Sequence, residues 1–150
     1  MIVQLKNISK QYKDAKFKLQ NISFDINKKE VIGIIGRNGT GKSTILKMIN
    51  GIVNYDSGDI LYKNQSLSEM TPATLRQTRK NLAYIFQHSN LIDNKSVYYH
   101  LSLVYKLNKV PVDKKKVNYI LEFMNISRLK DSLCGSLSGG EQQKVAIAMA

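Results

Sequence analysis

The sequence has little cysteine, proline and acid, and no tryptophan. Because Cys134 is the only cysteine among 150 residues, no internal disulfide can form, which favours a reducing, cytoplasmic setting. Two prolines and nine glycines exclude a collagen-like or proline-rich chain. No apolar run reaches the about 18 residues of a membrane-spanning helix, and the N-terminus does not resemble a secretion signal. The composition predicts one globular domain or less.

The shortage of acid leaves the chain strongly basic, with 23 Lys and Arg against 11 Asp and Glu and a net charge of +12. The lysines are scattered, and the only short runs lie at 28–29 and 114–116. No basic segment alternates with stacking aromatic residues, so we interpret the charge as a hydrated surface and expect no nucleic-acid partner. A chain that docks on a membrane complex would also tolerate this charge.

Hydrophobic periodicity divides the chain into a strand-rich first half and a helical second half. Apolar residues within 2–5 and alternating ones within 19–26 predict an antiparallel β portion. Residues 31–35 (VIGII) are apolar on both faces, which is typical of a strand buried in a parallel sheet. A helix should follow over 43–50, with Ile45, Leu46 and Ile49 on one face and Gly51 as its stop.

Further elements are predicted downstream. A short strand is expected at 59–62, a helix capped by Thr71 with Pro72 at its first position, and a strand at 82–87. The pattern turns helical from His88 onward. Its clearest part is the helical spacing of four apolar residues, namely Val117, Ile120, Leu121 and Met124.

The strongest local motif is GRNGTGKS at 36–43, an example of G-x-x-x-x-G-K-[ST] between a predicted buried strand and a helix. Glycines let successive backbone N–H groups turn inward around a phosphate. Lys42 would bring a cation to the β and γ phosphates, and Ser43 a hydroxyl to Mg²⁺. The helix N-terminus adds its positive dipole end. The motif in this context predicts nucleotide phosphate binding.

A second anion-binding candidate is the turn LSGGE at 137–141, directly before a predicted helix. Ser138 can cap that helix, and the two glycines leave backbone N–H groups accessible. On the residues alone, a Ser-Gly-Gly turn before a helix is more often an ordinary cap. His88 is interpreted as a contact residue, and His100 as structural because it has no partner at metal-binding spacing.

Three motifs together resemble those of ATP-binding cassette (ABC) ATPases. GRNGTGKST resembles the Walker A motif, Phe86-Gln87 the Q-loop and LSGGEQQ the signature sequence, in the family's order. The resemblance implies an α/β fold with a P-loop NTPase core, an N-terminal antiparallel β portion and a helical subdomain. We expect the β and P-loop core at 1–87, the helical subdomain at 88–140 and the start of the post-signature helix at 141–150.

The resemblance also implies site residues. Lys42 and Gln87 would be catalytic, Ser43 and Gln87 would hold Mg²⁺, and Tyr12 would stack on adenine. Residues expected to bind ATP in one subunit are Tyr12, Gly36, Arg37, Asn38, Gly39, Thr40, Gly41, Lys42, Ser43 and Thr44. Those expected to bind it from a second copy are Ser138, Gly139, Gly140 and Glu141.

The implied protein is a homodimeric, ATP-hydrolysing transporter subunit on the cytoplasmic membrane face. Its partners would be transmembrane permease subunits and, indirectly, a substrate-binding protein. Several segments are similar to methionine-importer ATPases, although Ser89 and Glu141 differ from the residues usual there. An exporter, an importer of another solute, a soluble cassette protein of translation or DNA maintenance, and a regulatory fragment without turnover stay open as alternatives.

Family members carry further motifs after the helix in which this sequence stops. The resemblance implies that the Mg²⁺-linked aspartate and the catalytic glutamate would follow Ala150. We therefore expect a cassette incomplete at the C-terminus. Such a chain should bind nucleotide weakly, lack efficient hydrolysis, and expose apolar surface where strands of the parallel sheet are missing.

Overall fold

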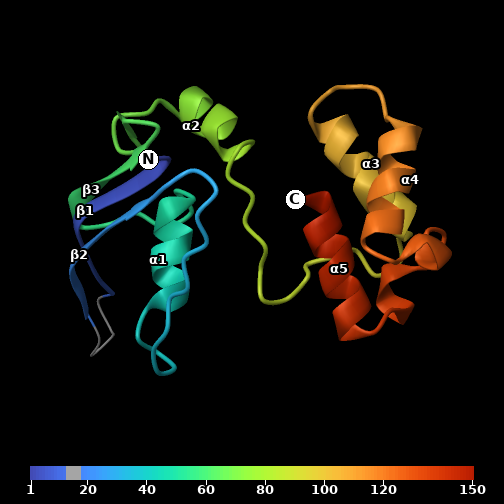
Figure 1. Cartoon of the computed structure of the whole chain (residues 1–150), viewed down its shortest axis with the longest axis horizontal. Helices are drawn as coiled ribbons and strands as arrows, with labels where there is room; N and C mark the ends of the chain where they lie inside the picture. Colours follow the sequence, from blue (N-terminus) through green and yellow to red (C-terminus); the bar gives the residue numbers. More distant parts are fainter. Residues whose placement is uncertain (13–17) are drawn as a thin grey trace. The chain divides into compact units, whose positions relative to one another are not determined.

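The computed structural model describes residues 1–12 and 18–150, which form two units, Met1–Ala83 and Tyr84–Ala150 (Figure 1). The first unit holds the described β-strands and two helices, and the second holds three helices. No helix in these described ranges is long and apolar enough to cross a bilayer.

The first unit is built on an antiparallel sheet with the strand order β2-β1-β3-β4. Its strands are β1 (Val3–Gln11), β2 (Lys18–Ile26), β3 (Ser57–Tyr62) and β4 (Gln65–Ser66). β1 lies between β2 and β3, and its Val3 pairs with Ile26 of β2 on one side and with Tyr62 of β3 on the other. The predicted antiparallel portion and the short strand at 59–62 are therefore confirmed.

Two helices complete the first unit, α1 (Lys42–Ile49) and α2 (Pro72–Arg79). The cap prediction for α2 is confirmed, because the Thr71 side chain accepts a hydrogen bond from the Thr74 N–H with Pro72 in the first turn. The buried face of α1 was predicted only in part. Ile45 and Met48, spaced i and i+3, lie in the core, whereas Leu46 is 47% exposed.

The strands predicted at 31–35 and 82–87 are wrong. Neither segment has regular structure, and Val31 and Ile35 are 96% and 97% exposed. An apolar strand of the parallel type is stable when hydrogen-bonded neighbours flank it and helices cover it. In the described ranges the hydrogen-bonded sheet contains β1 to β4 only, and it offers these segments no partner. The predicted exposure of apolar surface is thus confirmed.

The second unit packs α3 (Val97–Leu107), α4 (Lys114–Phe123) and α5 (Gly139–Met149) with two 3₁₀ turns, η1 (Ser127–Leu129) and η2 (Cys134–Ser136). The predicted periodicity of α4 is confirmed, since Val117 and Leu121 are buried. Residues buried in this core are Val97, Leu101, Val117, Leu121, Ile126, Leu129, Cys134, Leu137 and Val145.

The helical pattern predicted from His88 begins later than expected. Residues 88–95 are irregular, and α3 starts at Val97 after Ser96, whose side chain accepts from the Tyr99 N–H. His100 is 2% exposed and holds this irregular segment in place, because its Nε2 accepts from the Ile92 N–H at 2.9 Å. Its Nδ1 lies 2.8 Å from the Ser96 carbonyl oxygen. The structural role predicted for His100 is confirmed.

Candidate functional site

The loop at residues 36–41 turns back on itself before α1 and requires glycine at two positions. Gly39 and Gly41 have φ values of +82° and +86°, in the left-handed region that side chains disfavour. A Cβ at Gly41 would also lie 2.9 to 3.0 Å from three side-chain atoms of Leu19 on β2. The glycines of the motif therefore allow both the backbone bend and a close approach to the sheet.

Lys42 folds back over this loop. Its Nζ donates to the carbonyl oxygens of Gly36 and Arg37, each at 2.8 Å, and the Thr40 hydroxyl donates to the Arg37 oxygen at 2.9 Å. The ion pairs found in the described ranges join Lys10 with Asp56 and Arg128 with Glu141. No acid there neutralises Lys42 or Arg37, so the loop carries two cationic side chains that can meet an anion.

The first turn of α1 adds unsatisfied donors at the same place. Gly41 caps α1 without a side-chain hydrogen bond. The other α-helices in the described part of the chain are capped by side chains, those of Thr71, Ser96, Asp113 and Ser138. The free N–H groups and the positive dipole end of α1 therefore suit the phosphates of a nucleotide, together with Lys42. The loop fits the predicted ligand.

Tyr12 follows the end of β1 in the same unit and is 47% exposed. The Lys10 ammonium, paired with Asp56 at 2.7 Å, lies 5.6 Å from its ring centroid. Two residues of β2 show that this strand end lies near the phosphate loop. Lys18 pairs with Gln11, and the neighbouring Leu19 is the residue that Gly41 closely approaches. This end of the β1–β2 pair and the phosphate loop are therefore neighbours within the first unit.

The turn at residues 138–141 caps α5 in the second unit. Ser138 and Glu141 form a reciprocal capping box: the Glu141 N–H donates to the Ser138 hydroxyl oxygen, and the Glu141 carboxylate accepts from the Ser138 N–H at 3.0 Å. The same carboxylate accepts from the Ser138 hydroxyl at 2.8 Å. The predicted cap is confirmed, and Gly139 and Gly140 are exposed beside it.

The charge of Glu141 is stabilised where it lies. Hydrogen bonds from the Ser138 backbone N–H and hydroxyl hold the pKa of the Glu141 carboxyl below its usual range, and the nearby Arg128 and Lys144 charges add smaller effects. Arg128 forms a 2.9 Å ion pair with this carboxylate. Sequence reasoning missed Arg128, because an exposed arginine nine residues before the motif carries no local signal.

Gln87 lies exposed in an irregular segment of the second unit. This segment contacts α5, because the Ser89 hydroxyl donates to Gln142 Oε1 at 3.1 Å, and Gln142 Nε2 donates to the Cys134 carbonyl oxygen at 3.0 Å. The second unit thus connects the segment after Gln87 to the helix that Ser138 caps. The sequence did not reveal that Gln142, inside the signature stretch, bridges Ser89 and Cys134.

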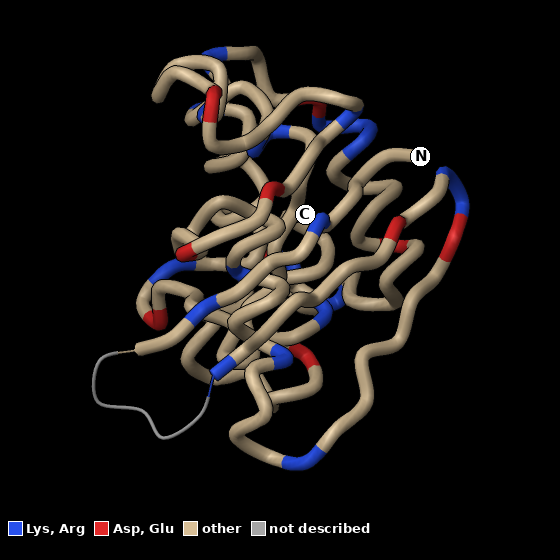
Figure 2. The backbone as a smooth tube through the Cα atoms, turned by 90° about the vertical axis from the view of Figure 1, so that its left-hand side faces the viewer, with Lys and Arg blue, Asp and Glu red and all other residues tan. Residues whose placement is uncertain are grey.

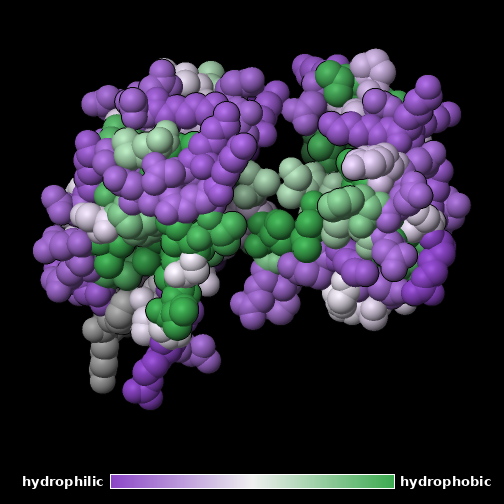
Figure 3. Space-filling view, viewed as in Figure 1, coloured by the Kyte–Doolittle hydropathy of each residue, from purple (hydrophilic) through white to green (hydrophobic). Residues whose placement is uncertain are grey.

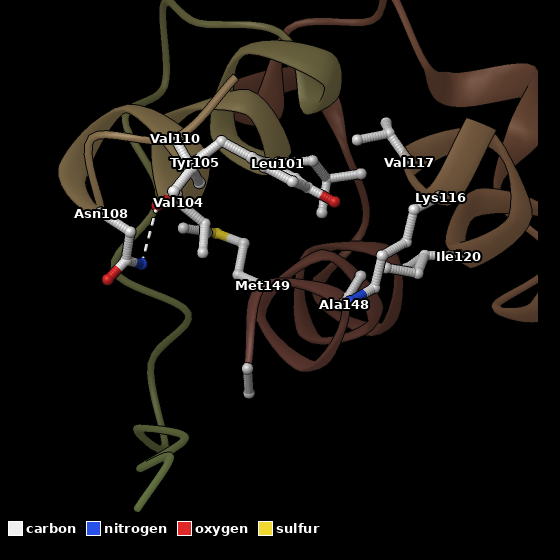
Figure 4. Close-up of a pocket in the computed structure, with 11 residues that line it drawn as sticks. Leu101, Val104, Tyr105, Asn108, Val110, Lys116, Val117, Ile120, Ala148 and Met149 are labelled. Carbon is white, nitrogen blue, oxygen red and sulfur yellow. Dashed lines mark hydrogen bonds between the residues drawn. The ribbon is translucent and has the colours of Figure 1, made fainter. Parts of the chain in front are cut away.

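A separate pocket of about 450 Å³ lies within the second unit, between α3, α4 and the end of α5 (Figure 4). Its walls are mainly aliphatic, including Leu101, Val104 and Val117. The Asn108 amide at its rim donates to the Val104 carbonyl oxygen at 3.0 Å, drawn as a dashed line in Figure 4. Across the described ranges no cluster of three or more metal-ligating side chains occurs. The pocket therefore offers mainly apolar contacts, with Lys116 as the charged residue of its lining.

Comparison with known proteins assigns the family. A family model described as ABC transporter matches residues 19–150. The chain belongs to the ABC transporter family. This ABC cassette also has the α/β fold of P-loop NTPases, shown by its structural neighbours. One of them is a dimeric ATP-binding cassette, MJ0796, described as a post-hydrolysis state bound to ADP and Pi, with a TM-score of 0.85 and 26% identity. The match covers 99% of this chain and 68% of MJ0796.

Two curated relatives of the cassette have the same identity but different names. The methionine import ATP-binding protein MetN of Clostridium tetani is 39% identical over 99% of this chain and 47% of its own length. The molybdate/tungstate import ATP-binding protein WtpC of Methanocaldococcus jannaschii is 39% identical over 99% of this chain and 48% of its own length. The chain therefore spans about half the length of these relatives.

Proposed function

We propose that this ABC cassette binds ATP with Mg²⁺ through the loop at 36–44 and is the ATP-binding part of an import system. The observation that carries the proposal is the loop itself. Its Lys42 and Arg37 have no acidic partner in the described ranges, and its two left-handed glycines lead into a helix without a side-chain cap. Each feature favours a bound polyphosphate.

Within one subunit we assign the following roles. Lys42 would exchange the carbonyl oxygens of Gly36 and Arg37 for phosphate oxygens, with which its charge interacts more strongly. Ser43, exposed in the first turn of α1, would offer its hydroxyl to Mg²⁺, which when bound neutralises phosphate charge. The family resemblance alone implies Gln87 as a second Mg²⁺ ligand. Tyr12, at the strand end beside the loop, would stack on the adenine ring.

A second copy of the chain would complete the site. Its exposed Ser138, Gly139 and Gly140, with Glu141, would cover the γ-phosphate at the N-terminus of α5. The dimeric MJ0796 cassette bound to ADP and Pi supports this arrangement. Gln87 and Lys42 would take part in ATP hydrolysis. Loss of the γ-phosphate would separate two surfaces that it had joined.

We infer a peripheral position on the cytoplasmic membrane face, with transmembrane permease subunits and a substrate-binding protein as further partners. Methionine is the preferred solute, because several relatives at 34–39% identity are named methionine import proteins. A molybdate or tungstate importer is the second candidate, because WtpC reaches the same 39%. Tagging the chain in its native cell and identifying the co-purified permease tests both. An exporter or a ribosome in the purified complex would contradict both.

The nucleotide site is tested by calorimetric titration of MgATP into the Lys42→Ala variant. Because two charge-assisted hydrogen bonds to phosphate would be lost, we expect affinity to fall at least about 100-fold. Lys47→Ala is the matched control, since Lys47 lies in the last turn of the same helix. It should bind MgATP like the unchanged chain. Equal affinity of the Lys42 variant, with an unchanged melting temperature, would contradict the proposal.

A further inference from the structure

The end of α3, the following loop and the first turn of α4 form a strongly basic surface, which we call the basic tip and define as residues 106–116. It contains five lysines and one aspartate, a net charge of +4 within 11 residues. All five lysines are exposed, and no ion pair found in the described parts of the chain includes them. The lone acid, Asp113, accepts from the Lys116 N–H and caps α4. The tip therefore concentrates positive charge within a short stretch of sequence. Figure 2 shows Lys and Arg at many separate places along the backbone.

Large apolar side chains lie exposed among these lysines. Leu107 is 74% exposed and Val110 is 49% exposed. The exposed face of α4 continues this pattern at four-residue spacing, with Lys115, Tyr119 and Phe123. Tyr119 is 65% exposed and Phe123 is 76% exposed. Their rings stack with centroids 6.3 Å apart. Figure 3 shows hydrophobic atoms next to hydrophilic ones at the upper end of this unit, where the α3–α4 loop lies in Figure 1.

We propose that the basic tip binds an anionic lipid surface, with Leu107 and Val110 entering the headgroup region and the lysine ammonium groups contacting lipid phosphates. Lysine suits this position because its aliphatic stem accompanies apolar neighbours into the interface while its charge stays at headgroup level. Tyr119 and Phe123 would extend the contact, since aromatic rings favour the interfacial region. The proposal concerns a surface of the second unit and does not depend on nucleotide binding.

The composition of the tip favours lipid over the other anionic partners. Residues 106–116 contain no arginine and no aromatic residue, the side chains that grip phosphate bidentately and stack on bases. The exposed aliphatic groups gain nothing from a nucleic-acid backbone but are stabilised in the outer acyl region. A cluster of four to eight basic residues beside apolar ones is the pattern that anionic membrane surfaces attract.

The test uses the absence of tryptophan from the chain. A single tryptophan introduced by Leu107→Trp becomes the only indole emitter. We expect its emission to shift to the blue with phosphatidylcholine vesicles containing phosphatidylglycerol at about one in three lipids, and not with pure phosphatidylcholine. The shift should diminish as salt is raised. Leu133→Trp, at a position 52% exposed in the same unit but outside the tip, is the matched probe and should not shift.

Charge is tested by changing Lys106, Lys109 and Lys115 to Gln in the Leu107→Trp background. Partitioning onto the anionic vesicles should fall about 100-fold, because each lysine near the surface contributes roughly five-fold. Changing three exposed lysines of the first unit to Gln, namely Lys28, Lys29 and Lys80, removes the same charge and should change partitioning little. Four results would overturn the proposal: no shift, equal shifts of both probes, equal losses in both triple variants, or preferential binding of duplex DNA.

Discussion

Replacing Gly41 by alanine tests whether the phosphate loop is packed against the sheet as the structure shows. The new side chain would meet two separate penalties. At φ +86° a residue other than glycine costs about 1–2 kcal/mol. Its Cβ would also lie 2.9 to 3.0 Å from Leu19 Cδ2, Cδ1 and Cγ, and overpacking of this kind costs about 1–3 kcal/mol. Rotation about χ2 of Leu19 cannot relieve all three contacts, because it leaves Cγ in place, and a change of χ1 would have to repack a buried side chain.

Gly39→Ala is the matched control for the first penalty. Gly39 has a similar φ of +82°, but a Cβ there would meet nothing within 4 Å. We therefore expect Gly41→Ala to lower the free energy of unfolding by about 2–5 kcal/mol and Gly39→Ala by about 1–2 kcal/mol. Urea denaturation followed by circular dichroism measures both values.

A double-mutant cycle with Leu19→Ala isolates the contact. Leu19→Ala alone removes a buried side chain and costs about 2–5 kcal/mol. It also makes room for the new Cβ, so the double variant should be about 1–3 kcal/mol more stable than the sum of the two single changes predicts. Equal losses for the two glycine variants, or strict additivity in the cycle, would refute the packing of Gly41 against Leu19.

Two further predictions concern the cap of α5. Ser138→Arg should abolish ATP-dependent dimer formation in light scattering while leaving ATP affinity unchanged, because it blocks the surface that a second copy would cover. Ser136→Arg, two residues away and also exposed, is the control and should still form the dimer. A Ser138→Arg variant that still dimerises would disprove the role of Ser138 in the dimer surface. Glu141→Gln should make the free energy of unfolding depend less on pH in the acid range. The folded-state pKa of Glu141 is lowered, so its contribution is present above the ordinary value of 4.5 and is lost as pH falls through the folded value. Glu122→Gln is the control, and an unchanged acid response of the Glu141 variant in urea titrations would contradict this.

The elements that the sequence predicted correctly depend on short-range chemistry. Thr71 and Ser138 accept hydrogen bonds from N–H groups three residues on, so each cap is encoded within four residues. The spacing of Val117 and Leu121 likewise needs only one helix to be recognised. The motif around Lys42 belongs to the same class, because its glycines and lysine act within a single loop.

The wrong and missing predictions share one cause. Strand structure at 31–35 requires partners elsewhere in the chain, and an apolar run does not reveal whether they are present. The burial of Met48 in place of Leu46 depends on how α1 is rotated against the sheet. The bridges through Arg128 and Gln142 join residues 13 and 53 positions apart, distances over which a single sequence carries no pairing signal.

By itself, the sequence determined the order of the motifs, the helix caps and the excess of positive charge, because each is a local property of the chain. Tertiary structure alone decided that Leu19 packs against Gly41, that Ser89 reaches α5 through Gln142, and that five lysines remain exposed beside Leu107. The physical reason is that burial, pairing and charge density depend on which distant residues are brought together. Only the folded chain specifies those neighbours.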